Sequence, residues 1–212
     1  MKLFVTGVAG QLGHDVMNEL NKRGYEGVGS DLAPEYSGIQ DGTAVTTMPY
    51  VSVDITDASA VEKAITEAGV DGVVHCAAWT AVDAAEDEDK QEIVRKVNVL
   101  GTENIAKVCK KLGIKMMYLS TDYVFDGQGT TPWEPDCKAY KPLNVYGQTK
   151  LDGELAVYNN VDKFFIIRIA WVFGVNGKNF IKTMLRLGKE RGAVSVVNDQ
   201  IGSPTYTYDL SK

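Results

Sequence analysis

The sequence predicts an α/β fold with a doubly wound parallel sheet. Short segments rich in apolar and β-branched residues alternate with segments of helical periodicity, and a glycine-containing turn joins the first of each kind. The predicted strands are 2–6, 26–31, 51–55, 72–77, 115–121 and 164–170, and the predicted helices are about 11–23, 57–68, 88–111 and 146–159. Helices on both faces of a parallel sheet account for this alternation.

The turn after the first strand contains Gly7, Gly10 and Gly13, and an amphipathic helix follows it. The backbone N–H groups and the dipole of such a helix N-terminus favour a pyrophosphate. We assign Gly7 to the tight turn, Gly10 to close backbone approach and Gly13 to helix–strand packing, as in a Rossmann fold. The spacing is G-x-x-G-x-x-G, not the commoner G-x-G-x-x-G, so an ordinary tight turn is the alternative.

Asp31 ends the second predicted strand, 18 residues after Gly13. A carboxylate at this position accepts hydrogen bonds from the adenosine ribose hydroxyls and repels a 2′-phosphate. The residues that follow, 32–34, include no Lys or Arg to bind such a phosphate. The sequence therefore favours NADH over NADPH, and the alternative is a capping or turn aspartate.

The ends of the third and fourth strands supply further cofactor candidates. Asp54 lies where a side chain can reach an adenine edge, or else it belongs to the start of the next helix, whose N-cap is Thr56 or Asp57. Ala77 and Ala78 are small enough to let the backbone pass close to a dinucleotide, although a plain buried strand end is the alternative.

Tyr146 and Lys150 are four residues apart on a predicted helix and share one face. An ammonium near a phenol lowers the phenol pKa, which suits proton transfer to a carbonyl oxygen during its reduction. Thr121, at the end of the fifth strand, offers a hydroxyl to that carbonyl, or is an ordinary strand-end hydroxyl. Tyr208 and Lys212 have the same spacing but lie far from the ligand-binding edge, so we interpret this second pair, the decoy pair, as a chance match with no catalytic role.

Asn98 is predicted in the middle of a helix, where Asn is mildly unfavourable. It is either a buried Asn that forms hydrogen bonds with the backbone near the cofactor site or an ordinary polar position of the helix without a functional role. The acidic run 86–89 is interpreted as helix-dipole stabilisation and not as a metal site.

Two long loops, and the end of the strand–helix alternation after residue 170, indicate the domain organisation. The loops are 32–50 and 122–143, and the second follows the fifth strand at the edge where α/β sheets bind ligands. After residue 170 we expect a helix over 179–191, a strand over 194–198 and a helix from 204. We therefore assign 1–170 to a dinucleotide-binding Rossmann domain and 171–212 to part of a C-terminal substrate-binding lobe.

Composition excludes several classes of partner. The net charge of −6 argues against nucleic acid and anionic membranes, and no apolar run is long enough for a membrane span. Three cysteines without a C-x-x-C motif favour reduced thiols, and with no signal peptide we expect a cytoplasmic protein. The chain has only two histidines, which argues against a zinc site, so no metal is expected.

Several segments together resemble the dTDP-4-dehydrorhamnose reductases, a family of extended short-chain dehydrogenases/reductases. The segments are GVAGQLG at 7–13, AAWTAVD at 77–83, STDYVFDG at 120–127, YGQTKLDGE at 146–154, RIAWVFG at 168–174 and DQIGSPT at 199–205. The resemblance extends over nearly the whole chain. It implies reduction of the C4 keto group of dTDP-4-dehydro-L-rhamnose to dTDP-L-rhamnose, with NADH or NADPH as the cofactor.

The resemblance also implies roles for individual residues. Tyr146 would donate the proton, Lys150 would lower its pKa and hold the nicotinamide ribose, and Thr121 would orient the carbonyl. The residues expected to contact the cofactor are Gly7, Gly10, Gln11, Leu12, Gly13, Asp31, Asp54, Ile55, Ala77, Ala78, Trp79, Asn98, Tyr146 and Lys150. The residues expected to contact the dTDP-sugar are Val82, Thr121, Asp122 and Trp171.

The chain departs from the family in two respects. Members continue past the position that matches Lys212, so we expect this chain to lack a C-terminal part. Such a chain should bind NADH but reduce the sugar poorly. It should also self-associate, for example as a homodimer. His75 and Cys76 stand where the family usually has Asn. The alternatives are a sugar-nucleotide epimerase or dehydratase, although a dehydratase would carry Glu at Tyr123, and a dinucleotide-binding regulatory subunit like that of methionine adenosyltransferase.

Overall fold

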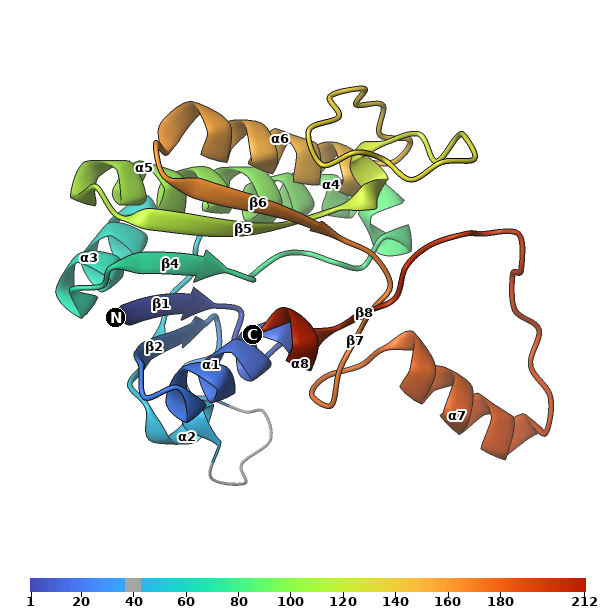
Figure 1. Cartoon of the computed structure of the whole chain (residues 1–212), viewed down its shortest axis with the longest axis horizontal. Helices are drawn as coiled ribbons and strands as arrows, with labels where there is room; N and C mark the ends of the chain where they lie inside the picture. The colour runs from blue at the N-terminus through green and yellow to red at the C-terminus, as the bar shows by residue number, and fades with distance from the viewer. Residues whose placement is uncertain (37–42) are drawn as a thin grey trace.

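A six-stranded parallel sheet forms the centre of the molecule (Figure 1). The computed structural model describes residues 1–36 and 43–212, so part of the predicted loop 32–50 lies outside the described residues. The strand order is β3-β2-β1-β4-β5-β6, and each neighbouring pair is parallel. The strands are β1 Lys2–Thr6, β2 Glu26–Asp31, β3 Tyr50–Ser52, β4 Gly72–His75, β5 Lys115–Thr121 and β6 Phe164–Ile169. The predicted doubly wound parallel sheet is confirmed.

Helices cover both faces of this sheet, because successive residues of each buried strand point to opposite sides. Phe4 packs with α3 (Ala58–Ala68), α5 (Thr102–Leu112) and α6 (Val145–Asn160). Its neighbour Val5 packs on the other face with α1 (Gln11–Lys22) and the short α2 (Ala44–Thr47). Figure 1 shows the two helical layers on either side of the strands.

Five elements differ from the sequence-based expectation. The predicted helix 88–111 consists of α4 (Glu88–Arg95), a π-helical segment over Lys96–Gly101, and α5. Gly101 lets this segment approach Ile55, since a Cβ there would lie 2.6 Å from Ile55 Cγ1. The third and fourth strands end at Ser52 and His75, short of the predicted ends at 55 and 77.

The predicted strand over 194–198 is wrong, because this segment has no regular structure. Val194, Val196 and Val197 are exposed there, and among the described residues no strand pairs with them. The predicted helix from 204 instead begins as the strand β8 (Thr205–Tyr206), which pairs in parallel with β7 (Val172–Phe173), and continues as α8 (Thr207–Leu210). Local apolar patterns could not show which segments find a partner.

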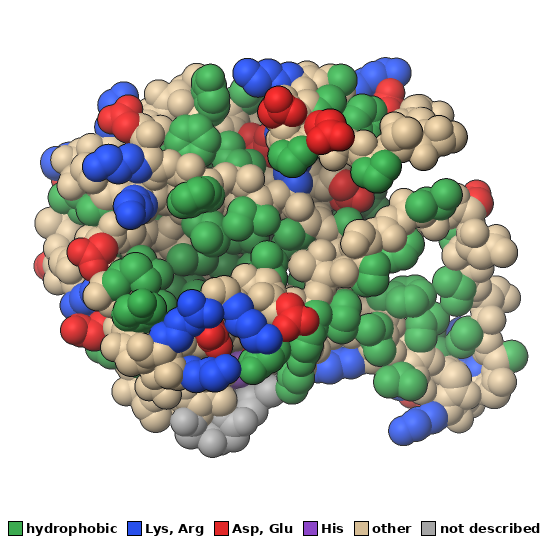
Figure 2. All heavy atoms as spheres, in the orientation of Figure 1, with side chains coloured by type: hydrophobic (Ala, Val, Ile, Leu, Met, Phe, Trp, Pro, Cys, Tyr) green, Lys and Arg blue, Asp and Glu red, His purple; other side chains and the backbone are tan. Residues whose placement is uncertain are grey.

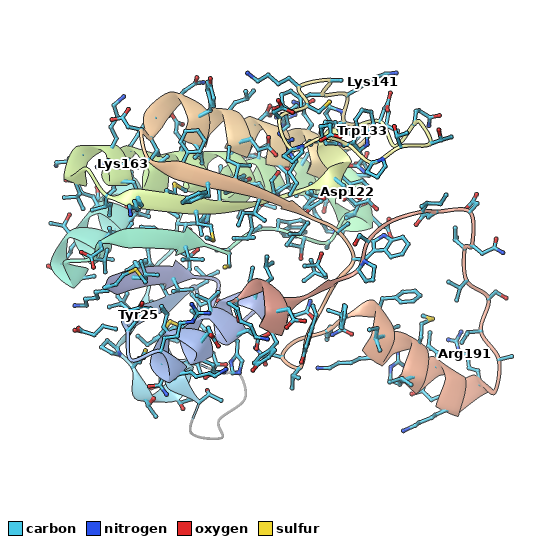
Figure 3. All side chains as sticks on the ribbon, in the orientation of Figure 1. Tyr25, Asp122, Trp133, Lys141, Lys163 and Arg191 are labelled. Atoms are coloured by element: carbon cyan, nitrogen blue, oxygen red, sulfur yellow. The ribbon has the colours of Figure 1, made fainter. Side chains whose placement is uncertain are left out.

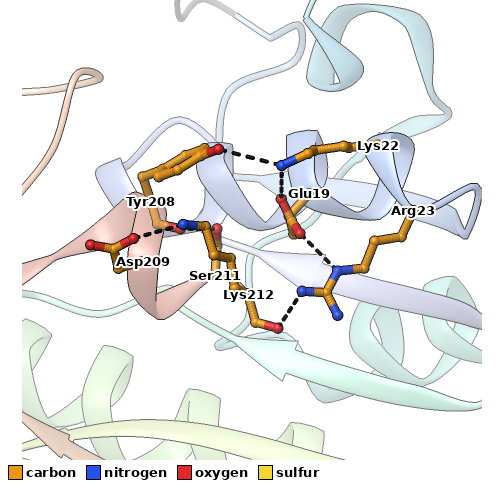
Figure 4. A network of polar contacts seen from close by, with 7 residues as sticks. All are labelled: Glu19, Lys22, Arg23, Tyr208, Asp209, Ser211 and Lys212. Carbon is orange, nitrogen blue, oxygen red and sulfur yellow. Dashed lines mark hydrogen bonds and ion pairs between the residues drawn. The ribbon is translucent and has the colours of Figure 1, made fainter.

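The C-terminal residues return to the first helix of the chain (Figure 4). Glu19 on α1 accepts from Arg23 Nε at 2.7 Å, and an Arg23 guanidinium nitrogen donates to the Lys212 carbonyl at 2.7 Å. Lys22 approaches the Tyr208 hydroxyl at 3.4 Å, and Lys212 Nζ lies 4.3 Å from the centre of the Tyr208 ring. The Tyr208–Lys212 pair is therefore part of a surface network that fastens α8 to α1.

The helix α7 (Phe180–Arg191) lies apart from the sheet and has no buried residue. Phe180, Ile181 and Leu185 are exposed on it, and Figure 2 shows hydrophobic side chains gathered over this region. Apolar side chains are therefore exposed on α7, and the homodimer that would cover them stays a prediction. Across the described ranges, no helix combines the length and apolar character that a membrane crossing requires.

A chain of hydrogen bonds runs through the interior at the end of β4. His75 is 1% exposed, with Nδ1 2.8 Å from Thr6 Oγ1 and Nε2 3.0 Å from Thr102 Oγ1. Because Thr102 donates its hydroxyl proton to the Asn98 carbonyl at 2.7 Å, Nε2 carries the imidazole proton and donates it to Thr102. Thr6 then donates to Nδ1 and accepts from the Ala77 N–H at 3.1 Å. The ring is neutral, and burial lowers its pKa to about 3.

This buried imidazole makes the fold sensitive to acid. Between pH 6.5 and about 3 the unfolded chain binds a proton at His75 that the folded chain does not, so stability falls as the pH falls. From pH 7 to pH 5 the wild type should lose ~2 kcal/mol more unfolding free energy than His75→Gln, whatever their difference at pH 7. Urea unfolding of both proteins at the two pH values measures this. Equal losses would show that His75 does not carry the acid sensitivity.

Candidate active site

A cleft of about 2190 Å³ opens along the carboxyl ends of the strands. It lies where the strand order reverses between β1 and β4, which is where doubly wound sheets bind ligands. Figure 3 shows Asp122 and Trp133 beyond the carboxyl end of β5, whereas Tyr25 and Lys163 lie at the opposite end of the sheet. Of the predicted site residues, all but Trp79 and Asn98 line this cleft.

The glycine turn lines the cleft. Gly7 has a φ of +72°, and a Cβ on it would lie 2.6 Å from the Ala77 nitrogen. A Cβ on Gly13 would lie 2.4 Å from the Gly7 carbonyl oxygen. Gly10 is the N-cap of α1 and has no side chain that could occupy the first N–H groups of the helix. The turn therefore leaves backbone donors next to the cleft, as a pyrophosphate requires.

Two aspartates lie beside this turn with different local roles. Asp31 accepts from the Ala9 N–H at 3.0 Å and from the Leu32 N–H at 2.8 Å, so its carboxylate is held between β2 and the turn. Asp54 accepts from the backbone N–H and the hydroxyl of Thr56 at 2.9 and 2.8 Å. Asp57 is the N-cap of α3, which resolves the choice between Thr56 and Asp57. Asp54 thus shapes a turn and also faces the cleft.

Asn98 supports the site from behind the cleft. It is 1% exposed, its Oδ1 accepts from the Trp79 N–H at 2.8 Å, and its Nδ2 donates to the Trp79 carbonyl at 3.2 Å. Nδ2 also lies 3.0 Å from the Thr149 hydroxyl on α6. The interpretation of Asn98 as a buried Asn that bonds the backbone is confirmed, whereas cofactor contacts of Asn98 and Trp79 stay predictions.

Close packing brings the catalytic candidates together. Asn144 caps α6 by accepting from the Gly147 N–H at 2.7 Å, and a Cβ on Gly147 would lie 2.3 Å from the Tyr123 carbonyl oxygen. The start of α6 therefore packs directly on the turn that follows β5. Tyr146 contacts the Tyr123 ring edge-on, with ring centres 5.9 Å apart, and a hydrogen bond joins it to Thr121.

Burial controls the protonation of this group. It raises the pKa of Tyr146 to about 12, against a smaller lowering by the hydrogen bond with Thr121. It lowers the pKa of Lys150 to about 7, against the opposing effect of Glu154. The Lys150 ammonium lies 4.2 Å from the centre of the Tyr118 ring. The pKa of Tyr146 is thus shifted in the direction opposite to the lowering expected from Lys150, and desolvation is the largest cause of the shift.

Arg168 lines the cleft and begins the motif 168–174, but it was not among the predicted site residues. It forms two bonds of 2.8 and 2.7 Å with the buried carboxylate of Glu154 and donates to the Tyr140 hydroxyl at 2.9 Å. Its guanidinium also lies 5.1 Å from the centre of the Phe125 ring. A charged residue within the otherwise apolar strand 164–169 was the available signal, since buried charges are nearly always paired.

The predicted substrate residues line the same cleft as the glycine turn. Val82, Thr121, Asp122 and Trp171 all contact the cleft. Among the described residues other than glycine, Trp171 is the one with a positive φ, at +47°. Its indole packs so closely on the Gly202 backbone that a Cβ there would lie 2.8 Å from the ring. This unusual backbone and the close contact orient Trp171, and its contact with substrate stays a prediction.

Comparison with known proteins agrees with this geometry. The family model described as RmlD substrate binding domain matches residues 1–212. A dTDP-4-dehydrorhamnose reductase of Streptomyces griseus is 40% identical over 209 residues, which cover 98% of this chain and 62% of that protein. The Escherichia coli K12 protein of the same name is 45% identical over 153 residues, 72% of this chain and 50% of its own length. The chain thus spans about half to two thirds of the length of these relatives.

Solved structures show the same similarity. A dTDP-4-dehydrorhamnose reductase from Clostridium acetobutylicum is 37% identical with a TM-score of 0.85, covering 100% of this chain and 68% of that one. The Bacillus anthracis enzyme, solved in complex with NADP, is 37% identical with a TM-score of 0.83, covering 99% and 67%. The resemblance inferred from the motifs is confirmed. The chain belongs to the RmlD substrate binding domain family, the family of the dTDP-4-dehydrorhamnose reductases.

Proposed function

We propose that this chain is part of an oxidoreductase that reduces the C4 keto group of dTDP-4-dehydro-L-rhamnose to give dTDP-L-rhamnose. One observation carries the proposal: Thr121, Tyr146 and Lys150 line the same cleft as the glycine turn. The substrate is suggested by the names of the relatives in the same family. Segment 1–170 would bind the dinucleotide, and segment 171–212, which contributes Trp171, would belong to the substrate-binding lobe.

The residues present fit a nicotinamide dinucleotide. The glycine turn is too crowded for side chains at Gly7 and Gly13, and no capping side chain occupies the first N–H groups of α1, which would hold a phosphate. Asp31 is placed to accept hydrogen bonds from the adenosine ribose, and the sequence from 32 to 50 contains no Lys or Arg for a 2′-phosphate. When bound, the dinucleotide supplies the hydride that reaches the carbonyl carbon. We propose NADH as the preferred form.

Tyr146 supplies the proton in this reaction. Its raised pKa keeps the phenol protonated at neutral pH, so it can donate to the keto oxygen as that oxygen gains charge. Thr121 holds the carbonyl oxygen toward the phenol. The phenolate left behind is costly in a buried site, and the charged form of Lys150 stabilises it.

We further propose a cytoplasmic location and a homodimer. Cys76, Cys109 and Cys137 are all free thiols, in accordance with a reducing compartment. The exposed apolar side chains of α7 support self-association.

Replacing Tyr146 by Phe should lower turnover of the keto-sugar by about 10²–10⁴-fold, because the proton donor is lost. Binding of NADH should change little. Loss of NADH absorbance in the presence of dTDP-4-dehydro-L-rhamnose measures turnover. Tyr208→Phe, which alters the decoy pair on α8, is the control and should retain activity. Near-normal turnover of Tyr146→Phe would exclude it as the proton donor.

Replacing Asp31 by Ala should weaken NADH binding and improve NADPH binding relative to NADH. The carboxylate that repels a 2′-phosphate is removed, while the ribose loses an acceptor. Fluorescence titration of both dinucleotides checks this in each protein. Wild-type protein that binds NADPH tenfold more tightly than NADH, a difference of ~1.4 kcal/mol, would contradict the role given to Asp31.

The pH dependence should report Lys150. Because its pKa is about 7, the fraction of charged lysine falls as the pH rises above 7, and kcat/KM should fall about tenfold per pH unit there. Tyr146, with a pKa near 12, should add no second limb between pH 6 and 9. A pH–rate profile at constant ionic strength measures both. A flat profile up to pH 9 would rule out a required charge on Lys150.

A further inference from the structure

The glycine turn is held from outside by a segment far along the chain, Gly174–Asn179, which we call the clamp. Asn176 Nδ2 donates to the Ala9 carbonyl at 3.1 Å and to the Gly10 carbonyl at 2.9 Å. The Asn176 side chain is buried, at 4% exposure, although 166 residues separate it from Gly10. The clamp lies beyond β6 and belongs to neither the strand nor the helix that form the turn.

The clamp is fitted closely against α1. A Cβ on Gly174 would lie 2.1 Å from Thr207 Oγ1, and this hydroxyl donates to the Asp15 carboxylate on α1. Gly177 has a φ of +69°, and a Cβ there would lie 3.2 Å from Gln11 Cγ. Asn179 Nδ2 donates to Gln11 Oε1 at 3.0 Å. Contacts at both ends of the clamp therefore keep Asn176 in place.

Two peptide planes of the turn depend on Asn176. A trans peptide holds its C=O and its N–H on opposite sides, so fixing one fixes the other. In the Ala9–Gly10 peptide, the carbonyl accepts from Asn176 and the Gly10 N–H donates to the Gly7 carbonyl at 3.0 Å. In the next peptide, the Gly10 carbonyl accepts from Asn176, so the Gln11 N–H at the first position of α1 points away from the Asn176 amide.

We propose that Asn176 is a positioning residue for the pyrophosphate of the dinucleotide. By keeping two carbonyls on the clamp, it keeps these partial negative charges out of the cleft and leaves the Gln11 N–H to face a phosphate. The cofactor site is then incomplete without a segment that lies outside the six-stranded sheet. This inference rests on the proposed function, because it assumes that the cleft binds a dinucleotide.

Comparing the binding of NADH and ADP with that of adenosine, which has no phosphate, distinguishes a role of Asn176 in positioning the phosphate site from a role in the stability of the fold. Asn176→Ala should weaken NADH and ADP about tenfold, the equivalent of ~1.4 kcal/mol, and leave adenosine unchanged. Asn176→Asp should weaken both phosphate ligands further, because its carboxylate repels the two carbonyls. Asn160→Ala is the matched control: it removes a similar bond, from Nδ2 to the Ala156 carbonyl at 2.8 Å, at the far end of α6. Calorimetry and ligand-detected NMR give the affinities, with thermal unfolding run alongside.

Three results would overturn the inference. They are unchanged NADH binding in folded Asn176→Ala, an equal loss for adenosine and ADP, and the same loss in Asn160→Ala. If Asn176→Ala does not fold, hydrogen exchange of the wild type decides, since NADH should then protect both the clamp and the glycine turn. Protection of the turn without the clamp would also overturn it. Wild-type protein that binds no NADH would instead overturn the proposed function beneath it.

Discussion

The close approach of the glycine turn to the end of β4 is the constraint on which the rest of the site depends. Gly7 lies so near Ala77 that no side chain fits between them, and β1 and β4 are neighbours with Thr6 paired to His75. The order of the strands therefore reverses between β1 and β4, where the backbones of Gly7 and Ala77 lie very close together. A cleft bounded by bare backbone follows from this geometry, and with it the capacity to hold an anionic ligand on N–H groups.

A buried chain of hydrogen bonds connects the end of β4 to α6, the helix that bears Tyr146 and Lys150. From Ala77 it passes through Thr6, His75 and Thr102 to the Asn98 backbone. The Asn98 side chain then bonds Thr149, which donates to the Tyr146 carbonyl at 2.8 Å. Because the groups of this chain are buried and bonded to one another, they hold the end of β4 and the start of α6 together. The same burial that makes these bonds strong also sets the protonation of Tyr146 and Lys150.

Residues after the six-stranded sheet contact the glycine turn and α1 and also line the cleft. Trp171 lines the cleft, whereas Asn176 reaches back to the glycine turn and Thr207 to α1. The segment 171–212 is therefore fastened to the first helix at several points, although α7 between them has no buried residue. The boundary at residue 170 is therefore crossed by contacts in both directions, and the assignment of 1–170 and 171–212 to two functional parts stays a prediction.

Much of the fold and of the site could be predicted from the sequence because the signals are local. Hydrophobic periodicity within ten or so residues predicted the six strands and most helices. The glycine turn, Tyr146 and Lys150 were predicted as parts of one site, and they line one cleft. The failures have a common cause. The segment 194–198 has a strand-like pattern but no partner, the Tyr146 pKa is set by burial, and Asn176 contacts residues 166 and 167 positions away. Pairing, desolvation and distant contacts exist only after packing, so only the tertiary structure decided them.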